Sequence, residues 1–214
     1  MGRLTLLGAG VSAVAAVSAT WNPSDKAADV TLSNGNLTMT ASAGPESVRT
    51  GATVTSSQKV YYEIILDNRT FNPRIGFANS FSSLTVALGA DFPATSFGLG
   101  LNTGTYNCGG SASDATATLP GGMANGDRIG VAFNSLTLLI WFRLNNGAWN
   151  SVIGGAQDPA AGTGGLIVAP DTNHPLDPYM AIAEASAGGD QMTANFSSGS
   201  WVDTVPSGYT QLAS

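Results

Sequence analysis

The chain has 214 residues and a formal net charge of −6 at pH 7, and charged residues make up 10% of it, against roughly 25% in an ordinary soluble domain. It has no cluster of Lys and Arg to neutralise phosphates, so we expect no nucleic-acid partner. The single cysteine, Cys108, excludes an intrachain disulfide and argues against Cys-based metal sites, and the single histidine, His174, excludes a multi-His zinc site.

Residues 1–20 combine an early Arg3, an apolar stretch and small residues that end at Ala19. This pattern is typical of a signal peptide cleaved after Ala19, and it is too short and too interrupted for a membrane span. The interpretation we favour is a retained N-terminal arm that lies on another subunit. The alternative is an arm folded back over Leu139 and Trp141. The candidate assembly residues of the arm are Leu4, Leu6, Leu7, Val11, Val14 and Val17.

The first part of the domain reads as short strands separated by turns. Asn22–Asp25 is predicted to be a turn, and Asp29–Leu32 and Leu37–Ala41 are predicted to be strands joined by a hairpin turn at residues 33–36. Lys59–Leu66 is a predicted strand because its residues alternate and include β-branched and aromatic side chains.

Two apolar runs, Ile129–Phe133 and Leu136–Leu144, predict an antiparallel hairpin. In the second run both faces are apolar, with Ile140 on one and Trp141 on the other, so another segment or chain must cover the outward face. The first run alternates bulky residues with small ones such as Gly130, which leaves one face flat.

The C-terminal part contains a long loop, Gly154–Pro178, of a length that is usually functional or mobile. Leu166–Ala169 is a predicted short strand within this loop. Tyr179–Ala183 and Met192–Phe196 are the last predicted strands, and the sequence shows no helix longer than one turn and no 20–50-residue repeat.

Gly126–Val131, followed by an apolar strand and Asn146–Gly147, resembles the central repeat of SPRY (B30.2-like) domains. Two stretches are similar to SPRY-type proteins encoded by tailed bacteriophages: Ile140–Arg143 with Gly147–Asn150, and the opening residues Trp21–Thr38. The resemblance runs in order to Tyr209, although Ser197 replaces a glycine that is usual in the family. The remaining matching segments are Tyr61–Leu66, Arg74–Ala78, Ser96–Leu101, Gly104–Asn107, Trp201 and Val205–Tyr209.

This resemblance implies an all-β antiparallel sandwich of the SPRY or concanavalin-like jelly-roll type, with the arm at 1–20 and the domain at 21–214. SPRY domains are interaction modules without catalytic residues or cofactors. The phage-like form implies a structural protein of the virion, either a head decoration or a fibre or tail component. Such a protein would bind other virion proteins through the arm and act as a homo-oligomer or multi-copy assembly. A glycan- or receptor-binding adhesin is the alternative, and it would be secreted if residues 1–19 are a cleaved signal.

Candidate catalytic residues do not form a convincing set. His174 has no nucleophile near it in sequence, and Cys108 has no basic neighbour to lower the pKa of its thiol. Glu63 and Glu184 are the carboxylates in or next to strands, too few for the acid and base of a glycosidase. We therefore expect no enzyme, and a secreted enzyme would need an acid–base pair that the sequence does not show.

Loop residues are the better functional candidates, because sandwich folds gather their binding loops at strand ends. The loop aspartates lack the dense spacing of a self-contained calcium site, so we expect no metal; they are Asp91, Asp158, Asp171 and Asp177. Phe92 and Trp149 have an equally good alternative role as plugs of the open sandwich ends. The candidate binding-loop residues are Phe71, Asn72, Asp91, Phe92, Trp149 and Asn150.

Overall fold

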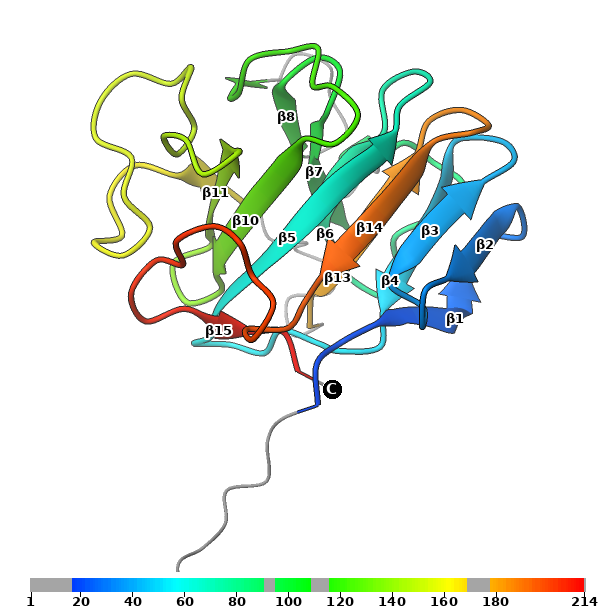
Figure 1. Ribbon diagram of the computed structural model, residues 1–214. Helices are drawn as coiled ribbons and strands as arrows, with labels where there is room; N and C mark the ends of the chain where they lie inside the picture. The colour runs from blue at the N-terminus through cyan, green and yellow to red at the C-terminus, as the bar shows by residue number, and fades with distance from the viewer. Residues whose placement is uncertain (1–16, 91–94, 109–115, 169–177, 214) are drawn as a thin grey trace, which may run out of the picture.

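The structure is a computed structural model that describes residues 17–90, 95–108, 116–168 and 178–213, and every regular element in these ranges is a β-strand. Two sheets face each other in a sandwich, as predicted (Figure 1). Among the described residues, neighbouring strands pair antiparallel except β15, which pairs parallel with β5.

Strands that are neighbours in a sheet are often far apart in the chain. From one edge to the other, the first sheet contains β1 (Trp21–Lys26), β4 (Glu46–Thr50), β13 (Met180–Ala185), β6 (Arg74–Ala78), β7 (Ser96–Gly100), β8 (Thr105–Cys108) and β9 (Thr116–Ala117). The second sheet contains β12 (Leu166–Ile167), β11 (Leu139–Leu144), β10 (Arg128–Asn134), β5 (Lys59–Asn68), β14 (Gln191–Asn195), β3 (Thr38–Ala41) and β2 (Val30–Ser33), with β15 (Thr210–Gln211) beside β5.

Alternation along the strands builds the core between the sheets. The bulky face of β10 points inward, where the Phe133 ring lies 4.7 Å from Phe77 and 5.6 Å from Phe97 of the first sheet, measured between ring centroids. On β11, Ile140 and Phe142 join the same core. The predicted antiparallel hairpin and its inward and outward faces are therefore confirmed. Burial of these rings stabilises the fold by several kcal/mol in all, at ~25 cal/mol per Å² of apolar surface.

The second strand of this hairpin begins at Leu139 and not at Leu136, which corrects the predicted boundary. The side chain of Asn134 accepts hydrogen bonds from the backbone N–H groups of Leu136 and Thr137, and so closes a turn. Leu138 ends the turn with a φ of 52°, in the left-handed region. Leu136 is 69% exposed as a result.

The predicted turn at Asn22–Asp25 is also corrected, because these residues lie inside β1. The strand pairs with β4 at Trp21 and Lys26 only, and the register is irregular between them. The Ser24 N–H donates to the Asn22 side chain, as in a turn. An edge strand tolerates both this bulge and a proline. The turn-forming residues of the sequence therefore produce an irregularity within an edge strand and not a separate turn.

Part of the outer face of each sheet is covered by the protein's own chain. Residues 79–90, which we call the cover, pack Leu88 onto Ala78 and Ile182 of the first sheet. Residues 197–209, which we call the strap, lie over the base of β10 and β5 in the second sheet (Figure 1). The apolar outward face of β11 is thus covered, as predicted, and the strap is one of the segments that covers it.

The two ends of the described chain meet at the base of the sandwich (Figure 1). Ser18 forms an antiparallel bridge with Ala213, and the Ala19 N–H donates to the Leu212 carbonyl at 3.0 Å. Within the described residues we find no helix with the length and apolarity that a bilayer crossing requires.

Candidate functional site

The strap is fixed to the second sheet through a buried carboxylate. Glu63 on β5 is fully buried, and its side chain accepts the backbone N–H groups of Val202 at 3.1 Å and Asp203 at 2.8 Å. Arg128 on β10 donates through Nε to the Asp203 carboxylate at 2.7 Å and lies 4.0 Å from Glu63. Buried charges are tolerated only when they are paired and hydrogen-bonded, so this carboxylate serves to hold the strap.

Arg143 on β11 forms the second attachment of the strap. Its guanidinium donates to the Thr204 carbonyl and to the Tyr61 hydroxyl, and it lies 4.5 Å from the centroid of the Trp149 ring. Burial raises the pKa of Tyr61, which keeps its hydroxyl neutral. Gly130 on the flat face of β10 leaves room for the Tyr61 hydroxyl. A Cβ atom at this position would lie 2.8 Å from the hydroxyl oxygen, which is too close.

Two of the predicted binding-loop residues, Trp149 and Asn150, follow β11, and Trp149 belongs to an aromatic cluster with Tyr61 and Trp201. Trp149 is partly buried, and its ring packs edge-to-face on Tyr61 with centroids 6.4 Å apart. Asn150 is fully buried, and its side-chain oxygen accepts the Phe142 N–H at 2.9 Å while its amide nitrogen donates to Gln157. Both side chains are thus engaged with the chain itself.

The other two described candidates lie in the β5–β6 loop. Phe71 is 63% exposed, whereas Asn72 is partly buried and accepts the Asn102 N–H at 2.9 Å. Asp190 holds this loop: its Oδ1 accepts the Thr70 N–H at 2.6 Å and the Thr70 hydroxyl at 2.8 Å. Phe71 therefore protrudes from a loop with a fixed backbone.

Asp190 also orders the neighbouring β13–β14 turn, which sequence reasoning missed. Its Oδ2 accepts the N–H groups of Ser186 at 2.9 Å and Ala187 at 3.0 Å. The side chain is fully buried although the sequence around it, Gly188-Gly189-Asp190, reads only as a turn. No local pattern would have linked it to a loop 120 positions away.

The predicted candidates do not gather at one place. Phe71 and Asn72 lie at the end of β5, and Trp149 lies over Arg143 on the outer face of the second sheet. Asp91 and Phe92 fall outside the described residues. Of the arm, Val17 is 68% exposed; the arm residues outside the described ranges are Leu4, Leu6, Leu7, Val11 and Val14.

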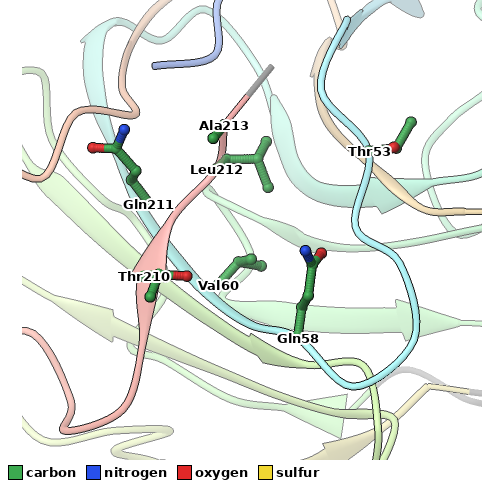
Figure 2. A pocket seen from close by; sticks show the side chains of 7 residues that line it. All are labelled: Thr53, Gln58, Val60, Thr210, Gln211, Leu212 and Ala213. Atoms are coloured by element: carbon green, nitrogen blue, oxygen red, sulfur yellow. The ribbon is translucent and has the colours of Figure 1, made fainter. Parts of the chain in front are cut away.

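Two hollows flank residues 51–53 at the base of the sandwich. The first, of ≈ 220 Å³, lies between β15 and the loop before β5 (Figure 2), and it is lined by Thr53, Gln58, Val60, Thr210, Gln211, Leu212 and Ala213. The second, also of ≈ 220 Å³, is lined by Thr20, Trp21, Asn22, Pro23, Gly51 and Ala52. Small hydroxyl and amide groups beside aliphatic ones suit a polypeptide segment better than a charged ligand.

The two strand carboxylates do not face each other. Glu63 lies on the outer face of the second sheet under the strap, and Glu184 lies on the outer face of the first sheet under the cover. Burial raises the pKa of Glu184 to about 7, against the opposing effects of the Leu88 N–H and Arg74. This separation by the whole sandwich provides no shared cleft for an acid and a base.

Two of the remaining polar candidates, Asp158 and Cys108, lie in the described part of the chain. Asp158 accepts the Ala160 N–H at 2.8 Å in a local turn, and Cys108 is a partly buried free thiol. His174, Asp171 and Asp177 fall outside the described residues. Within the described ranges, no three His, Cys, Asp or Glu side chains gather as they would around a metal ion.

Comparisons with known proteins identify the fold. No protein-family model matches the sequence, and none of the curated proteins matches it. The SPRY domain of human HERC1 is similar in structure, with a TM-score of 0.58 at 11% identity over 82% of this chain and 96% of that chain. A human SPRY domain gives 0.56 at 15% identity over 78% and 94%. The PSpry domain of TRIM65 gives 0.57 at 14% identity over 83% and 91%.

Proposed function

We propose that this chain, which has the SPRY-like fold, is a non-enzymatic interaction protein of a tailed-phage virion, acting as a head decoration or as a fibre or tail component. The phage assignment rests on the ordered sequence motifs that begin at Trp21. Two of its buried carboxylates fit this proposal, because Glu63 and Asp190 are already bound to backbone N–H groups of the chain and are not free for chemistry.

The observation that carries the proposal is the position at which the N-terminal segment enters the domain, at the base of the sandwich. The chain enters the domain there, with Ser18 bridged to Ala213 and Val17 exposed, between two hollows. Residues 1–16 therefore join the domain at a surface with room for a polypeptide. In this proposal the apolar arm binds other virion proteins and makes the protein part of a multi-copy assembly.

The test compares the full chain with a variant that lacks residues 2–16, which keeps the Ser18–Ala213 bridge. We expect sedimentation velocity to show assemblies for the full chain and monomers for the deletion, with equal melting temperatures. A second variant keeps the length of the arm but carries Leu4→Ser, Leu7→Ser and Val11→Ser. It should also be monomeric if the apolar side chains of the arm make the contacts. Mass spectrometry of the protein recovered from particles supplies the second test, since a mature N-terminus after Ala19 would contradict the proposal.

A second candidate function, a glycan- or receptor-binding adhesin, is favoured by one observation. Phe71 is 63% exposed on a loop that Asp190 holds in place, and an exposed aromatic ring on a rigid loop suits a ligand surface. A glycan array with the full chain and with Phe71→Ala tests it. Binding that the substitution abolishes would support the adhesin, and an array without binding would rule out glycan ligands.

A further inference from the structure

The cover is held on the first sheet by side chains that bind its backbone. Arg49 on β4 donates through Nη1 to the carbonyl oxygens of Asn79 at 2.8 Å and Ser82 at 2.9 Å. Arg74 on β6 donates to the Leu88 carbonyl at 2.6 Å. The Leu88 N–H in turn donates to the Glu184 carboxyl on β13 at 2.9 Å. Glu184 is thus the acidic member of the set that holds the cover.

Glu184 lies in a row of polar residues that is not fully satisfied. Ser47 on β4 and Arg74 on β6 are its direct partners across the two neighbouring strands. Ser47 Oγ, Glu184 Oε1 and Arg74 Nε are buried without a hydrogen-bond partner among the described residues. An ionised carboxylate needs several donors to replace its lost water, and here one of its two oxygens has none.

The surrounding charges do not make up this deficit. Arg74 is the nearest cation, with Nε 3.6 Å from Glu184 Oε2, and it favours the ionised form. Arg49 is next on the same face of β4, but it is paired with Asp25 at 2.7 Å. Asp190 adds a negative charge that opposes ionisation. Burial is the largest effect of all, and it favours the protonated carboxyl.

We propose that Glu184 is a proton-operated latch, which keeps the cover closed while it is protonated and lets the cover open when it ionises. Opening brings water to the carboxylate, which then no longer bears the cost of burial. It also uncovers the apolar group formed by Ala78, Leu88 and Ile182. The first sheet would therefore expose this apolar group on its outer face at mildly alkaline pH, and the cover would bury the group in mild acid.

The direction follows from proton linkage. The closed state holds the Glu184 proton up to about pH 7, whereas an exposed glutamate loses it near 4.5. Between these values the closed state binds more protons than the open one, so raising the pH favours opening. The open population is expected to rise by up to ~300-fold across this window and to level off above it.

Amide hydrogen exchange resolved by NMR tests the proposal at pH 5 and pH 8, after correction for intrinsic exchange rates. The reporters are the Leu88 N–H, bound to Glu184, and the Ser47 N–H, bound to the Leu84 carbonyl in the cover. We expect their opening to increase at least ~tenfold, with almost no dependence on urea, as a local opening requires. Reporters with the urea slope of the core amides would contradict a latch, because they would open only by global unfolding.

Two glutamine variants separate Glu184 from other acids. Glu184→Gln cannot ionise, so the pH response of both reporters should disappear. Glu46→Gln is the matched control, because Glu46 on β4 pairs with Ala185 and so points to the opposite face of the sheet. The control should keep the full response. In the unmodified protein, the carboxyl ¹³C shift of Glu184 should titrate near pH 7, and a midpoint near 4.5 would overturn the proposal without any variant.

Discussion

Asp203 is bound to Glu63 through its backbone, and the two carboxylates share one arginine. The Asp203 N–H donates to Glu63 Oε1 at 2.8 Å, across 140 positions of sequence. Arg128 Nε lies 2.7 Å from Asp203 Oδ1 and 4.0 Å from Glu63 Oε2. The positive charge of the guanidinium offsets the repulsion between the two buried carboxylates. The three side chains together hold the strap on the second sheet.

Glu63→Gln is expected to destabilise the protein by about 2–4 kcal/mol, because an amide NH₂ would meet backbone N–H donors that now bind a carboxylate. Urea unfolding monitored by tryptophan fluorescence measures the change. Asp67→Asn is the matched control on the same strand: Asp67 is partly exposed and accepts one hydroxyl, from Thr193, so its loss should cost less than ~1 kcal/mol. Equal costs for the two variants would contradict this role for Glu63.

Gly130→Ala tests the close packing of β10 against the aromatic cluster. The added Cβ would lie 2.8 Å from the Tyr61 hydroxyl oxygen and 3.0 Å from Arg143 Nε. Both side chains are buried, so we expect a loss of about 1–3 kcal/mol and a lower melting temperature. Gly154→Ala has no atom within 4 Å of the new Cβ and should change stability by less than ~0.5 kcal/mol.

The global stability of the protein should also depend on pH through Glu184. Its folded-state pKa of about 7 lies above the ordinary value of 4.5, so its contribution to stability is complete below pH 4.5 and is lost as the pH rises to about 7. The loss is at most roughly 3 kcal/mol, and urea titrations at pH 5 and pH 8 measure it. Glu46, whose pKa burial also raises, acts in the same direction. Glu184→Gln should remove most of the slope.

Asp190→Asn is expected to loosen two loops at once, because the carboxylate serves the β5–β6 loop through Oδ1 and the β13–β14 turn through Oδ2. An amide offers one acceptor where the loops need two, so we expect a loss of about 2–3 kcal/mol. Limited proteolysis should show new cleavage in residues 69–72 and 186–189. Cleavage confined to one of the two segments would mean that the loops are ordered independently.

The sequence was sufficient for features that depend on neighbouring residues and was insufficient for those that join distant ones. Alternation in Ile129–Phe133 correctly predicted a strand with one flat face, since side-chain direction has a period of two. Leu136 was wrongly placed in a strand, because hydrophobicity does not reveal a turn closed by the Asn134 side chain.

The candidate site was harder to predict for the same reason. Trp149 was recognised as an aromatic residue near a strand end, but its contact with Arg143 depends on how two strands register. Nothing near Glu63 in sequence indicates that residues 202–203 will bind it. A buried carboxylate with distant backbone donors leaves no local periodic signal, so only the folded arrangement shows its role.

The meeting of Ser18 with Ala213 has a geometric consequence for any assembly that contains this protein. A partner that binds either end of the described chain would contact the sandwich at its base, beside the start of β5 at Val60. β5 runs from there to Asn68 and leads into the loop that carries Phe71. An attached copy would therefore carry this loop, with its exposed Phe71 ring, at the end of β5 opposite to the attachment.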